Sequence, residues 1–183
     1  KLGWTGFAEK HLGRFFPLDP EVLLAWTKRQ IDRYRTEGEV WKARNIPSLC
    51  GAMVMSPLMF LSTRRSLVSF TQDLYRFPDK VQAVMDAMVD DLIKFAIEAA
   101  RATGIPGVEL ILERGGCFYY PLRIFERFEF RYMKKMINAF AGEGLITVMH
   151  FDQDWTLNLP YLLDLPEKMC VCELDSTTDI FKA

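Results

Sequence analysis

The segment that decides the fold spans residues 108–150 and reads VELILERGGCFYYPLRIFERFEFRYMKKMINAFAGEGLITVMH. It begins with a short apolar run, VELILE, and ends with a second one, LITVM, directly before His150. Short apolar runs bounded by turn-forming residues are typical of buried strands. After Pro121, apolar residues recur at three- and four-residue steps, which indicates an amphipathic helix. A strand, a helix and a second strand in this order predict a parallel pair joined by a helical crossover.

The same alternation continues on both sides of this segment. On the N-terminal side, the pattern predicts a helix from Asp19 to about Thr36, a buried strand at residues 46–55 (IPSLCGAMVM), a helical stretch from Ser56, and helices at 65–76 and 78–103. On the C-terminal side, it predicts a short helix at 156–163, a strand at 168–173 (KMCVCE) and a further helix start at 177–179.

Continuous apolar strands that alternate with amphipathic helices indicate an α/β protein with a parallel sheet. The pattern alone allows an open doubly wound sheet or a closed barrel. No glycine-rich phosphate loop follows any predicted strand, which disfavours a dinucleotide-binding sheet. A complete (β/α)₈ TIM barrel needs roughly 250 residues, so we expect a fragment of about four strands. Residues 1–45 would form an N-terminal arm and helix, and residues 46–183 a partial barrel.

Composition narrows the class of protein. The chain has 183 residues, with 23 Lys and Arg against 24 Asp and Glu, so no basic excess indicates nucleic-acid binding. The longest apolar run, at 49–62, contains Pro57 and is too short to cross a membrane. The four cysteines of the chain do not form the disulfide framework of a small secreted protein. We therefore expect a cytoplasmic protein with no membrane contact.

Ionisable residues follow three of the predicted strands. Glu113 ends one strand, His150 and Asp152 follow the next, and Glu173 and Asp175 end the third. The carboxyl ends of parallel strands meet at one rim, which holds the active site in α/β folds. The candidate catalytic residues are therefore His150, Asp152, Glu113 and Asp175. For Asp175, a helix cap is an equally good interpretation.

Other residues near this rim are candidates for substrate contacts. Arg114 follows Glu113 in a glycine-containing turn, and Trp155 either lines the same pocket or covers it. Arg64 and Arg65 are best interpreted as a solvated helix face, with the binding of an anionic substrate as the alternative.

Four segments carry a resemblance to a known family. They are IPSLCGAMVMSPLMFLSTRR (46–65), DLYRFPDKVQAVMDAM (73–88), VELILERGGCFYYPLRIFERFEFRYMKK (108–135) and VCELDSTTD (171–179). In this order they resemble the uroporphyrinogen decarboxylase superfamily over residues 46–183. The resemblance implies a TIM barrel that acts on a tetrapyrrole or a corrinoid. The decarboxylases carry a Tyr where this chain has Thr63, and this match makes Thr63 a candidate for substrate contact.

A second branch of the superfamily, the cobalamin-dependent methyltransferases, carries a metal-binding His-x-Cys after one strand and a Glu after the next. By this resemblance His150 matches the His and Glu173 the Glu, whereas Asp152 replaces the Cys. The implied metal ligands are His150, Asp152 and Glu173, which suit Zn²⁺ and, because carboxylate is harder than thiolate, also iron or manganese.

The leading hypothesis is a metal-assisted methyltransferase that moves a methyl group between methylcobalamin and a thiol or similar acceptor. The methylcobalamin is either a free substrate or carried on a corrinoid protein. One alternative is a metal-free uroporphyrinogen III decarboxylase in which Asp152 orients His150 for proton transfer. Another is a non-catalytic protein that binds a tetrapyrrole or corrinoid. In each case the open strand edges of a half-barrel require either a second copy, as in a homodimer, or further chain to cover them.

Overall fold

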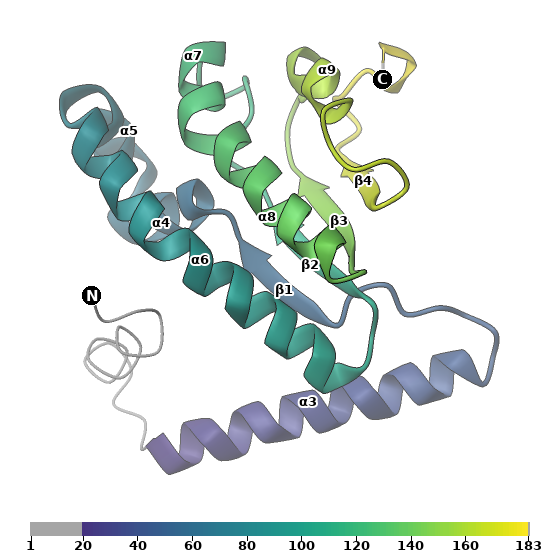
Figure 1. The fold of residues 1–183 in the computed structure, drawn as a ribbon. Helices are drawn as coiled ribbons and strands as arrows, with labels where there is room; N and C mark the ends of the chain where they lie inside the picture. The colour runs from purple at the N-terminus through teal and green to yellow at the C-terminus, as the bar shows by residue number, and fades with distance from the viewer. Residues whose placement is uncertain (1–19, 183) are drawn as a thin grey trace.

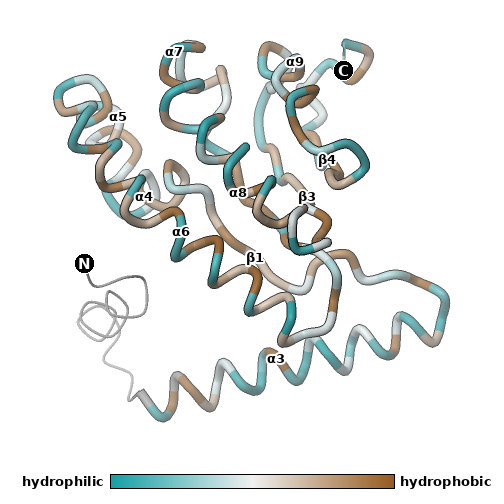
Figure 2. The backbone as a smooth tube through the Cα atoms, viewed as in Figure 1, coloured by the Kyte–Doolittle hydropathy of each residue, from teal (hydrophilic) through white to brown (hydrophobic). Residues whose placement is uncertain are grey.

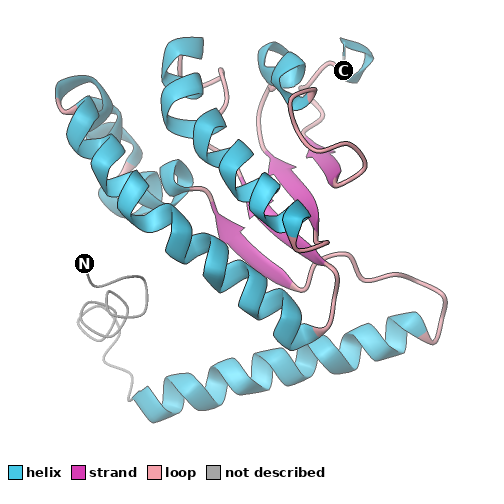
Figure 3. Cartoon of the chain, in the orientation of Figure 1, coloured by secondary structure: helices cyan, strands magenta, loops and turns pink. Residues whose placement is uncertain are grey.

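The computed structural model describes residues 20–182. The N-terminal arm and the Asp19 helix cap expected from the sequence lie outside the described residues. The described chain forms a four-stranded sheet, with helices between the strands (Figures 1 and 3). The strands are β1 (Ala52–Met55), β2 (Gly107–Ile111), β3 (Ile146–Phe151) and β4 (Cys170–Leu174).

All four strands run parallel, in the order β1-β2-β3-β4. This confirms the predicted α/β class with a parallel sheet. Strand β1 begins only at Ala52 and is therefore shorter than the predicted strand at 46–55. The chain before β1 instead crosses the start of β2, where the Leu49 carbonyl lies so close to Gly107 that any side chain there would clash.

The helices follow the predicted order with changed boundaries. They are α3 (Pro20–Lys42), α4 (Pro57–Arg65), α5 (Leu67–Arg76), α6 (Pro78–Thr103), α7 (Leu122–Phe125), the π-helical turn η2 (Glu126–Phe130), α8 (Arg131–Gly142), the 3₁₀ turn η3 (Thr156–Asn158), α9 (Leu159–Leu162) and the 3₁₀ turn η4 (Ile180–Lys182). The helix predicted after Pro121 is thus interrupted by a π-turn.

Helix α3 is longer than the sequence predicts, because it continues through Gly38, the residue expected to end it, to Lys42. A helical glycine costs only about 1 kcal/mol, which tertiary contacts can offset. Arg35 donates a hydrogen bond to the Ala102 carbonyl at 2.7 Å, which holds α3 against the end of α6. In Figure 1, α3 crosses below the amino-terminal ends of the strands.

The helices α6 and α8 cover only one face of the sheet (Figure 1). Val54, Leu110 and Met149 lie on this covered face and are buried against the two helices. Figure 2 shows alternating hydrophobic and hydrophilic stretches along α6, as expected of a helix with one buried side. No described helix covers the opposite face, where Met53 is 57% exposed. We call this second side the open face.

Among the described residues, no helix combines the length and the apolar character needed to cross a membrane.

We expect Met85→Ala in α6 to lower the free energy of unfolding by about 2–5 kcal/mol, because Met85 is fully buried in the core between helix and sheet. The matched control is Val84→Ala, since Val84 is 50% exposed on the same helix and should change stability by only about 0.5 kcal/mol. Urea unfolding followed by circular dichroism measures both. Equal losses would contradict the one-sided packing of α6.

Candidate functional site

The register of the parallel strands brings ionisable side chains together on the open face. His150 on β3 is opposite Ile111 on β2 and opposite Glu173 on β4. Alternate residues of a strand share a face, so Glu109 accompanies Ile111, and Glu113 continues the same row beyond the strand. Glu113 and Glu173, both predicted from the sequence, thus lie near His150 although the three residues come from different strands.

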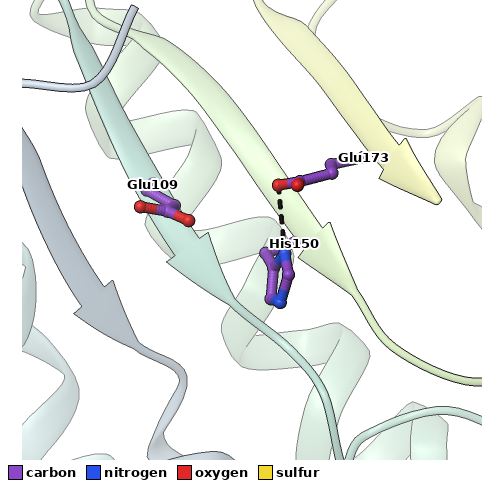
Figure 4. Close-up of side chains that lie close together, drawn as sticks. All are labelled: Glu109, His150 and Glu173. Atoms are coloured by element: carbon purple, nitrogen blue, oxygen red, sulfur yellow. Dashed lines mark hydrogen bonds and ion pairs between the residues drawn. The ribbon is translucent and has the colours of Figure 1, made fainter. Parts of the chain in front are cut away.

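The two ring nitrogens of His150 face different carboxylates. Nδ1 lies 3.0 Å from Oε2 of Glu173, a hydrogen-bonding distance drawn in Figure 4. Nε2 lies 3.5 Å from Oδ1 of Asp152 and 3.8 Å from Oε1 of Glu113. The imidazole is therefore held on one side by Glu173 and directed on the other toward the strand ends.

Glu109 belongs to the same cluster but was absent from the residues predicted from the sequence. Its carboxylate lies within 4.8 Å of ligand atoms of His150 and Glu173 (Figure 4). Glu109 was not predicted because it lies inside β2, whereas the predicted residues lie at the strand ends, as Glu113 does after β2. The available signal was a charged residue within the apolar run VELILE, two positions before Ile111 and four before Glu113.

The acids change the proton affinity of the imidazole. Partial burial disfavours its charged form, but the hydrogen bond and charge of Glu173, with the charges of Asp152 and Glu109, outweigh burial and raise the pKa of His150. The pKa of Glu109 is also raised, first by burial and further by the charge of Glu173, although the charge of His150 opposes this. The cluster therefore favours the uptake of positive charge.

Two groups in the described chain have the geometry to hold a metal ion: Glu113–His150–Asp152 and Glu109–His150–Glu173. The predicted ligand set of His150, Asp152 and Glu173 is divided between them, because Asp152 faces Nε2 whereas Glu173 faces Nδ1. A ligating histidine uses one ring nitrogen and usually donates the other N–H to a carboxylate. A metal bound through Nε2 would therefore take Glu113 and Asp152, with Glu173 as the orienting acceptor.

Asp175 and Trp155 lie near this cluster but make other contacts. The Asp175 carboxylate accepts hydrogen bonds from the backbone N–H and the hydroxyl of Thr177, at 2.8 and 2.7 Å, which lower its pKa. Asp175 thus caps a turn rather than the helix that the sequence left as an alternative, since the next described helical element, η4, begins only at Ile180. Trp155 is fully buried, donates its indole N–H to the Asp152 carbonyl and packs beneath Gly116. Its ring supports the loop after β3.

The other two predicted contact residues lie at the end of α4. Thr63 donates its hydroxyl to the Phe60 carbonyl at 2.9 Å, and Arg114 donates to the Ser62 carbonyl at 3.2 Å. Neither belongs to the two potential metal groups around His150.

A buried acid supports the turn that carries Glu113. Glu129, in the π-turn η2, accepts the Ser56 hydroxyl at 3.0 Å, and its other oxygen has no partner among the described residues. Its side chain fills the space beneath Gly115, where any Cβ would clash with it. Burial outweighs the Ser56 hydrogen bond and raises the pKa of Glu129 to about 8. An acid on the apolar face of a predicted helix was the sequence signal for this residue.

Comparison with known proteins adds no assignment to this site. No family model matches the chain, and no curated protein does. The site is therefore interpreted from its own chemistry.

We expect Glu173→Gln to lower the pKa of His150, because the amide keeps the contact with Nδ1 but removes the charge that favours the imidazolium. The chain has two histidines, so ¹H NMR titration of the ring protons, assigned with His150→Gln, measures the change directly. Glu167→Gln, at an exposed position beside Lys168, is the control and should leave the pKa unchanged. An unchanged pKa in Glu173→Gln would contradict the contact.

Glu129 should make stability depend on pH. Below the ordinary carboxyl pKa both folded and unfolded chains hold the proton, whereas between that value and about 8 only the folded chain does. Its contribution to the free energy of unfolding therefore falls as pH rises through this window, by up to about 1.4 kcal/mol per pH unit. Glu129→Gln should remove this part of the slope, as measured by denaturant unfolding at about pH 5.5 and about pH 7.5. The same slope in both proteins would refute the assignment.

Proposed function

We propose that residues 46–183 contain four consecutive strands of a (β/α)₈ barrel of the uroporphyrinogen decarboxylase type. The sequential strand order and the helices on one face support this, because a doubly wound sheet reverses its order and carries helices on both faces. In a barrel the open face is the interior, and side chains that point inward at the carboxyl ends of the strands form the active site. His150 and its acidic neighbours occupy that position.

The functional proposal depends on how the carboxylates lie around His150. Glu173 faces Nδ1, whereas Asp152 and Glu113 face Nε2. One nitrogen donor and two carboxylate donors, from His150, Glu113 and Asp152, fit a catalytic Zn²⁺ site with an open position, and the oxygen donors equally suit iron or manganese. A divalent metal bound there would act as a Lewis acid that lowers the pKa of a bound thiol or water.

The protein's own residues would prepare this site in two ways. Glu173 accepts a hydrogen bond from Nδ1–H, which fixes the tautomer whose Nε2 lone pair is directed toward Asp152 and Glu113. Glu109 adds negative charge below the imidazole and increases the attraction for a cation. Four carboxylates around one imidazole repel one another unless positive charge lies between them, so this arrangement favours a metal over an anionic ligand.

The reaction that we propose is the transfer of a methyl group between methylcobalamin, free or carried on a corrinoid protein, and a thiol acceptor. The thiol would be activated at the His150 site, as the resemblance to the corrinoid-dependent branch implies. The Asp152 carboxylate in place of a thiolate ligand would make the metal harder than in that branch.

The raised pKa of His150 favours one second candidate, metal-free decarboxylation of uroporphyrinogen III. An imidazolium stabilised by Glu173 and Asp152 is a proton donor, and the carbon left after loss of CO₂ must be protonated. This reaction requires no metal and leaves Glu113 and Asp152 as electrostatic partners of the imidazolium.

Calorimetric titration with Zn²⁺ and Mn²⁺ separates the two candidates. We expect one equivalent of metal to bind the wild-type chain, no stoichiometric binding in His150→Ala, and affinity about 10–100-fold weaker in Glu173→Gln, because that residue only orients the ligand. Asp90→Asn, which removes one carboxylate from α6 where it pairs with Lys135, is the control and should bind as the wild type does.

Absence of metal binding by the wild-type chain would overturn the metal-dependent proposal. Formation of decarboxylated porphyrinogen in the same metal-free preparation would then support the second candidate. Binding that persists in His150→Ala would place the metal elsewhere.

A further inference from the structure

Two arginines at the same rim have no carboxylate within ion-pair distance among the described residues. Arg64 lies in the last turn of α4 and Arg114 follows Glu113, and the hydrogen bonds of both go to uncharged groups. Their neighbour Arg65 differs, because it is paired with Asp73 at 2.7 Å. In the structure Arg64 and Arg65 therefore differ in their contacts, whereas the sequence predicted the same solvated helix face for both.

Arg64 reaches the open face at the level of His150. Its Nη1 lies 3.9 Å from the Met55 sulfur, 3.0 Å from the Thr63 hydroxyl and 3.4 Å from the Phe60 carbonyl, and its guanidinium lies over the Phe60 ring. These contacts hold the guanidinium beside the end of β1, although the side chain is exposed to solvent.

The strand register relates this cation to His150. Met55 pairs with Ile111, and Ile111 pairs with His150, so the three residues share one level of the open face. Neighbouring strands lie about 4.8 Å apart, which places the end of β1 roughly 10 Å from His150 across the rim.

Arg114, in the turn after β2, also contacts α4. It donates to the Ser62 carbonyl at 3.2 Å, one of the last carbonyls of α4, which lack partners within the helix. One N–H is used in this contact, and a guanidinium carries five. Arg64 contacts the Thr63 hydroxyl and Arg114 the Ser62 carbonyl, so both side chains are held at the C-terminal end of α4.

We propose that Arg64 and Arg114 form a subsite that binds the terminal oxyanion of a small-molecule substrate, a carboxylate or a phosphate. A guanidinium binds either group through two parallel hydrogen bonds. The rim is then polarised, with carboxylates at the ends of β2, β3 and β4 and cations at the end of α4. An oxyanion is repelled by the acids around His150 and attracted to the arginines, which orients the substrate.

This arrangement gives the substrate a length as well as a charge. Two strand spacings, roughly 10 Å, separate the backbone at the end of β1 from that of His150, so a substrate that reacts at His150 and is held by Arg64 is an extended molecule with one anionic end. The length rests on the proposed function, since it takes His150 as the reacting end. The binding of an oxyanion by the two arginines does not depend on it.

The test uses the full chain, stripped of metal and in chelator-free buffer, titrated separately with inorganic phosphate and with acetate. NMR signals of the arginine Nε–H groups report the binding. We expect saturable shifts at Arg64 and Arg114, and a dissociation constant raised about tenfold or more by Arg64→Gln or by Arg114→Gln. Arg64→Lys should give an intermediate loss, because it keeps the charge but not the two parallel donors. The tighter of the two probes identifies the oxyanion.

Arg29→Gln is the matched control, because it removes the same charge from an exposed position of α3 and should leave binding unchanged. Arg64 is largely exposed, so its variants should fold, and circular dichroism checks this for Arg114→Gln, which removes a contact at the end of α4. Wild-type affinity in Arg64→Gln, an equal loss in Arg29→Gln, or no binding of either probe would overturn the subsite. Because no metal is present, a failure of metal binding does not affect this result.

Discussion

The structure depends on the burial of one face of a parallel sheet by α6 and α8. Buried residues such as Leu110 and Met149 remove apolar surface from water on that face only. Strand residues alternate between faces, so the same packing directs every second residue to the other side. The position of His150 on the open face follows from the burial of Met149 and Phe151, its neighbours in sequence.

The site combines strands that are far apart in sequence but adjacent in the sheet. Glu113, His150 and Glu173 come from three successive strands, and parallel pairing places their ends at one rim. The concentration of negative charge around one imidazole is the main chemical property of this rim. It attracts protons and metal ions, and it would repel an anionic substrate that approached without a countercharge.

Arg64 and Arg114 would provide that countercharge at the end of α4. The buried acid Glu129 has a different role, because it lies beneath Gly115 and supports the turn between Glu113 and α7. When it is protonated, the Glu129 carboxyl group acts as an uncharged hydrogen-bonding group. Its location in a π-turn agrees with the tendency of such turns to occur near functional sites.

The sequence by itself determined the parallel α/β class, the order of the elements and the convergence of Glu113, His150 and Glu173, because hydrophobic periodicity reports which residues are buried. Only the tertiary structure decided which nitrogen of His150 each acid faces, that Glu109 joins the cluster, and that Asp175 caps a turn. These depend on strand register and on side-chain contacts between distant segments. The pairing of Arg65 with Asp73 and the contact of Arg64 with Met55 join consecutive elements, and they too depend on how those elements pack. Hydrophobic periodicity does not report such contacts, because they form only when separate strands and helices pack together.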